Sequence, residues 1–105
     1  MSEKKLAVNL INDLINILKA VKAKVGKDSD CTWSYFKSAQ DVHVEIDKYI
    51  SELEKGNTSS LSEIRIHFAP ASGYQELSMQ NNWSDAYLEL AERFDMIESQ
   101  LSKFS

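Results

Sequence analysis

Residues 68–83 read FAPASGYQELSMQNNW, and they interrupt a chain that otherwise follows helical periodicity. The stretch contains the only proline, Pro70, and one of the three glycines, Gly73. Loops longer than roughly 12 residues are uncommon in compact domains, and those that occur are often functional or packed by their own side chains. We expect a structured loop held against the core, because the stretch carries the large apolar residues Phe68, Tyr74, Leu77, Met79 and Trp83.

Amphipathic helices are predicted before this stretch. Residues 3–25 place apolar side chains at three- and four-residue spacing, the pattern of a helix with a core-facing side, and Gly26 is placed to end it in a left-handed conformation. A second helix begins near Ser38, which acts as a cap, and stops at Gly56. Both helices are expected to pack against a common core.

Shorter signals follow along the chain. Ser60-Leu61-Ser62-Glu63 has the form of a capping box, which predicts a helix from there to about Phe68. The alternation of apolar and polar residues over 64–68 also permits a short strand. After the interrupting stretch, Asn82 is predicted to cap a last helix that continues to near Lys103.

The predicted fold class is all-α. Residues 1–105 are expected to form a single helical domain, because a chain of this length buries roughly 60–65% of its extended-chain surface around one core. One-sided helices joined by short connections favour an up-down four-helix arrangement, with the structured loop over residues 68–83 before the last helix.

The charge balance limits the classes of partner. The net charge is −4 and the sequence pI is about 5.1. Nucleic-acid binding is not expected, since that function needs Lys and Arg to neutralise phosphates. Six lysines lie in the first quarter of the chain, so the rest is more acidic than the total suggests: Lys4, Lys5, Lys19, Lys22, Lys24 and Lys27.

The cysteine count and the hydropathy pattern indicate a compartment. The single cysteine, Cys31, excludes an intramolecular disulfide framework and favours a reducing, cytoplasmic setting. No run reaches the roughly 18 apolar residues needed to cross a bilayer, so no membrane association is expected.

A search for catalytic or metal-binding motifs predicts no catalytic residue, no cofactor and no metal. His43 and Asp47 share a helix face, but a zinc site needs three or four convergent ligands. Cys31 follows Asp30, which disfavours a reactive thiolate, and the serines lack the GxSxG context. The glycines are isolated, so no phosphate-binding loop is predicted. The chain is therefore interpreted as non-enzymatic.

A partner-binding surface is the remaining interpretation of the interrupting stretch. Aromatic anchors combined with amide and carboxylate groups suit protein recognition. The alternative is that the same aromatics fill the core while Asn and Gln satisfy loop backbone groups. The residues predicted to contact a partner are Glu45, Glu52, Tyr74, Gln75, Glu76, Asn82, Trp83 and Asp85.

Residues 64–95 also resemble a family of small, uncharacterised bacterial helical domains. The resemblance rests on Phe68-Ala69-Pro70, Ser72-Gly73, Gln75-Glu76-Leu77-Ser78 and Asn82-Trp83, a pattern F-A-P-x-S-G-x-Q-E-L-S…N-W that covers under a third of the chain. Small acidic helical domains are similar, in a generic way without a residue motif, to toxin-immunity proteins, which occlude a basic toxin by charge complementarity.

Three functional interpretations follow. The leading one is a protein-interaction module with an immunity- or inhibitor-like role, whose acidic surface steers a basic protein partner. The second is a small enzyme with a site between the helix over 38–55 and the 68–83 stretch, using His43, His67 or Glu76. The third is a helical structural subunit that buries the aromatic connector Trp33, Tyr35 and Phe36 in a homodimer.

Overall fold

The computed structural model describes residues 3–26, 38–68 and 73–101, with side chains from Val8 onward. These residues form five α-helices and no strand: α1 (Glu3–Lys24), α2 (Ala39–Glu54), α3 (Leu61–His67), α4 (Gly73–Gln80) and α5 (Ser84–Leu101). The all-α prediction is confirmed, and residues 64–67 are helical. Cys31, Pro70 and the aromatic connector over 33–36 lie outside the described residues.

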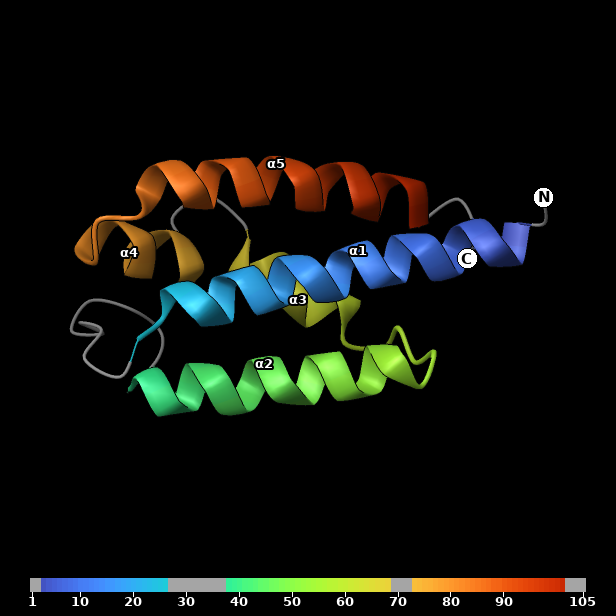
Figure 1. The fold of residues 1–105 in the computed structure, drawn as a ribbon, viewed down its shortest axis with the longest axis horizontal. Helices are drawn as coiled ribbons and strands as arrows, with labels where there is room; N and C mark the ends of the chain where they lie inside the picture. The colour runs from blue at the N-terminus through green and yellow to red at the C-terminus, as the bar shows by residue number, and fades with distance from the viewer. Residues whose placement is uncertain (1–2, 27–37, 69–72, 102–105) are drawn as a thin grey trace.

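Three long helices give the molecule its length, and two short ones complete its width (Figure 1). The central helix α1 packs against both α2 and α5 and runs antiparallel to them. The short helix α3 is drawn behind α1, and α4 lies against the first turns of α5. The described chain measures 45 × 23 × 19 Å along its principal axes. The bundle is therefore three long helices with α3 and α4 between α2 and α5.

The stretch over 68–83 differs from the expected loop, because residues 73–80 form the helix α4. Tyr74, Leu77 and Ser78 of this helix are fully buried, at the spacing that places side chains on one helix face. Two helical turns were too short a span for this period to stand out in the sequence. The core-facing role expected of the stretch holds for Phe68, Tyr74, Leu77 and Trp83, which are buried, but is wrong for Met79, which is 64% exposed.

An aromatic cluster joins α3, α4 and α5. Phe68, directly after α3, stacks on Phe94 with ring centroids 4.6 Å apart and meets Tyr74 edge-on at 5.1 Å. The hydroxyl of Tyr87 donates to the carbonyl oxygen of Phe68 at 3.0 Å, which satisfies a carbonyl at the end of α3. Side-chain packing and backbone hydrogen bonding therefore act together to place α3 against α5.

The ends of α2 follow the sequence signals. The backbone N–H of Asp41 donates to Oγ of Ser38 at 3.2 Å, so the predicted cap is confirmed. Gly56 has φ +81°, and its N–H donates to the carbonyl of Leu53 while that of Asn57 donates to the carbonyl of Glu52, both at 2.9 Å. This is the Schellman arrangement, which needs a residue in the left-handed region at the Gly56 position.

Other predicted caps are wrong, although α1 and α3 span the residues predicted for them to within about one residue at each end. Ser60 makes no side-chain cap on α3, because its hydroxyl donates to Glu52 of α2 instead. Asn82, with φ 64°, ends α4 and does not cap α5: the N–H of Trp83 donates to the carbonyl of Ser78 at 2.9 Å, a second Schellman closure. Gly26 has no positive φ, so α1 does not end in a left-handed residue.

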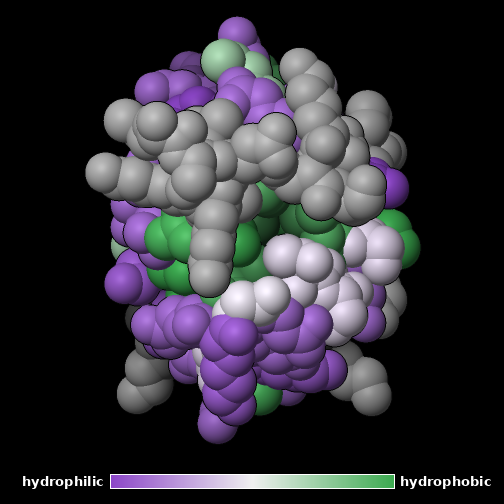
Figure 2. All heavy atoms as spheres, turned by 90° about the vertical axis from the view of Figure 1, so that its right-hand side faces the viewer, coloured by the Kyte–Doolittle hydropathy of each residue, from purple (hydrophilic) through white to green (hydrophobic). Residues whose placement is uncertain are grey.

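Figure 2 shows the end of the molecule at which α1 begins and α2 and α5 finish. Hydrophobic atoms are visible at its centre, and hydrophilic residues lie below them in this view. Among the described residues, none of the helices combines the length and hydropathy that crossing a membrane requires.

Candidate functional site

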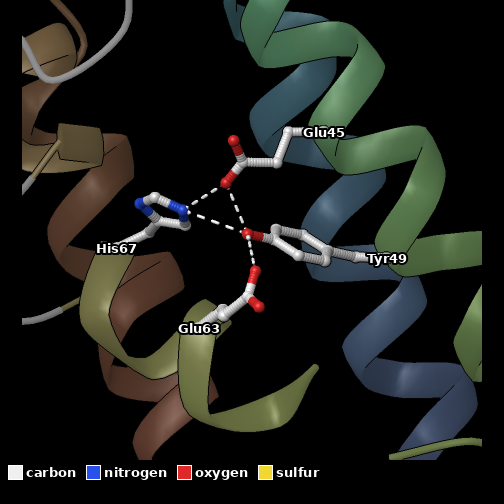
Figure 3. A network of polar contacts seen from close by, with 4 residues as sticks. All are labelled: Glu45, Tyr49, Glu63 and His67. Atoms are coloured by element: carbon white, nitrogen blue, oxygen red, sulfur yellow. Dashed lines mark hydrogen bonds and ion pairs between the residues drawn. The ribbon is translucent and has the colours of Figure 1, made fainter. Parts of the chain in front are cut away.

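Four polar side chains meet between α2 and α3, and we call them the Glu45–His67 network (Figure 3). Glu45 and Tyr49 lie one turn apart on α2, and Glu63 and His67 lie one turn apart on α3. Residues at this spacing share a helix face, so each helix presents a pair of polar groups to the other.

The hydroxyl of Tyr49 stands at the centre of the network. It donates to Oε1 of Glu45, and it lies 3.3 Å from Oε2 of Glu63 and 3.2 Å from Nε2 of His67. Nε2 of His67 is 2.5 Å from Oε1 of Glu45, so this nitrogen carries the proton and donates to the carboxylate. A phenol has one hydrogen to donate, so Tyr49 serves one carboxylate at a time.

The network extends from the core to the surface. Tyr49 is fully buried, the His67 side chain is 8% exposed, and the Glu45 side chain is 29% exposed. On the inner side, the ring of Tyr74 stacks on the His67 imidazole with centroids 4.9 Å apart. Buried polar groups destabilise a fold unless they are hydrogen-bonded, and the contacts described above supply those bonds.

Burial raises the pKa of Tyr49 well above its ordinary value, and the hydrogen bond to Glu45 and the negative charge of that carboxylate raise it further. Burial likewise raises the pKa of Tyr74, with a smaller effect from the charge of Glu45. Both phenols therefore stay neutral at physiological pH, and the Tyr49 hydroxyl acts as a donor, not as an anion.

The chemistry open to the network is proton sharing between α2 and α3. Its carboxylate oxygens and imidazole nitrogen converge on the Tyr49 hydroxyl, and no group of three or more metal-ligating side chains occurs among the described residues. The His67 ring is enclosed by Tyr49 and Tyr74. These hydrogen bonds between side chains of α2 and α3 hold α3 against α2.

His43 lies apart from the network. Its Nε2 is 2.5 Å from the carbonyl oxygen of Val25, just beyond the end of α1. Together with Ser38, Ala39 and Gln40 it lines a pocket of about 440 Å³ at the start of α2. The structure thus separates the three residues named for an enzymatic site, since His43 and His67 are held by different partners and Glu76 lies on α4.

Two residues predicted to contact a partner belong to the core. Tyr74 is 0% exposed and Trp83 is 7% exposed. Their large apolar rings are buried by the packing of α4 against α5, which the interpretation of this stretch as a loop did not anticipate. Neither side chain presents a surface to a partner in this fold, so both are removed from the contact set.

The other six predicted contact residues fall into two groups. Glu45 and Glu52 are half-buried on α2 and are engaged internally, Glu45 with Tyr49 and His67, and Glu52 as the acceptor of the Ser60 hydroxyl. The remaining four lie later in the chain. Gln75 and Glu76 are half-buried on α4, Asn82 is exposed between α4 and α5, and Asp85 is exposed in the first turn of α5. The eight residues therefore do not form one surface.

Sequence reasoning missed Glu63 and Tyr49 as members of a cluster. A usable signal was present, because two consecutive helices each carry a carboxylate and a ring donor or acceptor four residues apart: Glu45 with Tyr49, and Glu63 with His67. Such pairs share a face, and helices joined by a short turn bring their faces together.

No protein-family model matches this chain, and comparisons with curated proteins and with solved structures give no significant match.

Proposed function

We propose that the protein is a non-enzymatic interaction module that binds a basic protein partner, with an immunity- or inhibitor-like role as its concrete form. The observation that carries the proposal is a row of unpaired carboxylates along α5. Asp85, Glu89, Glu92 and Asp95 are all exposed, and none of them takes part in a hydrogen bond or ion pair within the described part of the chain.

Charges elsewhere in the described residues are compensated more often. Lys22 pairs with Asp47 at 2.6 Å, and Arg65 pairs with Glu98 at 2.6 Å. The carboxylates between α2 and α3 are used in the Glu45–His67 network and in the Glu52–Ser60 hydrogen bond. The outer side of α5 thus carries four carboxylates without an ion pair beside one exposed cation, Arg93.

The distribution of charge along the sequence strengthens this field. Residues 38–105 carry twelve acidic and five basic side chains, whereas residues 1–37 carry four acidic and seven basic ones. A field of one sign over one part of the surface accelerates encounter with an oppositely charged protein and repels nucleic acid and anionic membranes. A basic protein is the partner class that fits.

The test is capture of a partner from a lysate of the source organism on immobilised protein at low salt. We expect wild type to retain a basic protein that elutes as salt rises, and a variant with Glu89→Gln and Glu92→Gln to lose most of it. A matched variant, Asp13→Asn with Glu54→Gln, changes the net charge equally on other helices. If wild type retains no basic protein, the proposal is wrong.

A small acid–base enzyme is the second candidate, favoured by the 2.5 Å contact between Glu45 and His67 beside the Tyr49 hydroxyl. Its test is hydrolysis of a panel of chromogenic esters and phosphate esters. The candidate requires turnover above the buffer rate that disappears in His67→Asn, with circular dichroism showing that the variant remains folded.

A further inference from the structure

We infer that the outer face of α5 is the docking surface for a basic amphipathic helix of the partner protein, an inference that rests on the proposed function and specifies its surface. The outer face is defined by seven exposed residues: Asp85, Leu88, Glu89, Glu92, Arg93, Asp95 and Met96. Each of them lies three or four residues from at least one other member, so they share one side of the helix.

Two apolar side chains lie within the acidic row. Leu88 is 59% exposed and Met96 is 60% exposed, which makes them two of the largest apolar groups left open on the described chain. Eight residues along a helix span roughly 12 Å, so the pair forms two separate contact points with Glu92 between them. Tyr87, Phe94 and other residues of the opposite side of α5 are buried, so rotation of the helix cannot hide the pair.

The acidic row is unfavourable in the isolated molecule. Asp85 and Glu89 are four residues apart, and Glu89, Glu92 and Asp95 follow at steps of three. Like charges at these spacings destabilise a helix by roughly 0.2–0.5 kcal/mol per pair, and Arg93, four residues after Glu89, offsets part of this repulsion. A partner that supplies Lys or Arg against the row converts this repulsion into attraction.

The two apolar points and the carboxylates around them indicate a helical partner segment. A helix with apolar residues seven or eight positions apart matches the roughly 12 Å spacing, and Lys or Arg beside them reach the carboxylates. An extended segment is a poorer match, because the backbone groups of α5 are used within the helix and offer it no hydrogen bonds.

A second copy of this chain is a weaker fit than a separate partner. The exposed side of α1 in the described residues offers Lys19 and Lys24 with Ala23 between them, while Lys22 is paired with Asp47. It offers one large exposed apolar group, Val8 at 48% exposure, against the two that Leu88 and Met96 would contact. We commit to a partner protein as the occupant.

The test uses a fluorescein-labelled peptide of about 18 residues, long enough to be helical when bound, with leucines seven residues apart and lysines beside them. Binding is followed by fluorescence anisotropy at low salt. A second peptide of the same composition has its leucines moved to opposite faces. We expect the first peptide to bind at least about fivefold more tightly than the second, because only it meets Leu88 and Met96 together.

Variants of the protein locate the surface. Leu88→Ser with Met96→Ser is expected to weaken binding at least about fivefold, and Glu89→Gln with Glu92→Gln similarly. The matched control is Val44→Ser with Glu54→Gln, which removes one apolar group that is 61% exposed and one charge on α2. It should change binding by less than about twofold. All substituted positions are exposed, and circular dichroism verifies each fold.

The outcomes of these experiments distinguish failure of the α5 docking surface from failure of the proposed function. Equal binding of both peptides, or equal weakening by the α2 control, would overturn the α5 surface. If the basic protein captured by wild type is held equally by Leu88→Ser with Met96→Ser, the surface is wrong and the proposed function stands. If neither the peptides nor any basic protein binds, both fail. A chain that runs at twice 12.0 kDa and loses this behaviour in the Leu88 and Met96 variant would assign the face to a second copy and overturn the inference.

Discussion

Replacing Tyr49 by Phe isolates the contribution of one hydroxyl to the docking of α3. The ring is fully buried and stays in place, so the substitution leaves no large cavity. The hydroxyl donates to Glu45 and lies 3.2 Å from Nε2 of His67 and 3.3 Å from Oε2 of Glu63. Hydrogen bonds to charged groups contribute roughly 1.5–3 kcal/mol to stability. Because Glu45 keeps His67 and part of its solvent exposure, we expect a loss of about 2 kcal/mol.

Tyr87 provides a matched control for the same substitution. Its hydroxyl is buried and donates to the uncharged carbonyl oxygen of Phe68 at 3.0 Å. Neutral hydrogen bonds contribute roughly 1 kcal/mol. Tyr49→Phe should therefore lower the free energy of unfolding by about twice as much as Tyr87→Phe.

Urea unfolding followed by far-ultraviolet circular dichroism at neutral pH measures both losses. A double-mutant cycle of Tyr49→Phe with Glu45→Gln measures the coupling between the hydroxyl and the carboxylate. If Tyr49→Phe costs less than about 0.5 kcal/mol, or less than Tyr87→Phe, the network does not hold α3 in the way its geometry indicates. Independent effects of Tyr49 and Glu45 would lead to the same conclusion.

Three further predictions concern stability. The folded pKa values of Tyr49 and Tyr74 lie above the ordinary 10.0. Their contribution to the free energy of unfolding is therefore complete below about pH 10 and is lost as the pH rises beyond it, by up to about 2.7 kcal/mol per pH unit for the two residues together. Urea unfolding at stepped pH should show that Tyr49→Phe halves this slope. Gly56→Ala should lower the unfolding free energy by about 1 kcal/mol because of its φ of +81°, whereas Gly26→Ala, equally free of neighbours, should raise it by about 0.5 kcal/mol. Glu92→Lys should raise it by about 0.5–1 kcal/mol, seen as a higher thermal midpoint, since its two acidic neighbours three residues away then attract it.

Local signals made the long helices predictable. Ser38 and Gly56 act through hydrogen bonds within a few residues of themselves, so both ends of α2 could be read from the sequence. Ser60 shows where such reading fails. Its hydroxyl can either cap α3 or donate a hydrogen bond to Glu52 of α2, and the packing of the two helices determines which of these bonds forms.

The candidate site was less predictable, because its members depend on the docking of one helix on another. Glu45 was predicted to be a surface contact because a carboxylate on an amphipathic helix is usually solvated. The position of α3 places His67 2.5 Å from it and turns the carboxylate inward. Tyr74 and Trp83 were similarly ambiguous, since aromatic residues suit both cores and interfaces, and only the packing of α4 against α5 decides for the core.

The acidic residues of this chain therefore divide by location into two physical roles. Glu45 lies where hydrogen-bond donors from buried rings offset the loss of water, so its charge helps to fix the fold. Glu89 and Glu92 lie three residues apart on an exposed face where Arg93 is the single described cation of α5, beside apolar side chains that gain nothing from solvent. Changes that relieve the repulsion between these carboxylates, such as a lysine at position 92, stabilise the isolated chain while removing a charge that a basic partner would meet. A surface on which stability and charge complementarity oppose each other in this way is typical of a binding face, and this opposition is the physical reason why we propose α5, and not the internally satisfied carboxylates of α2, as the surface for a basic partner.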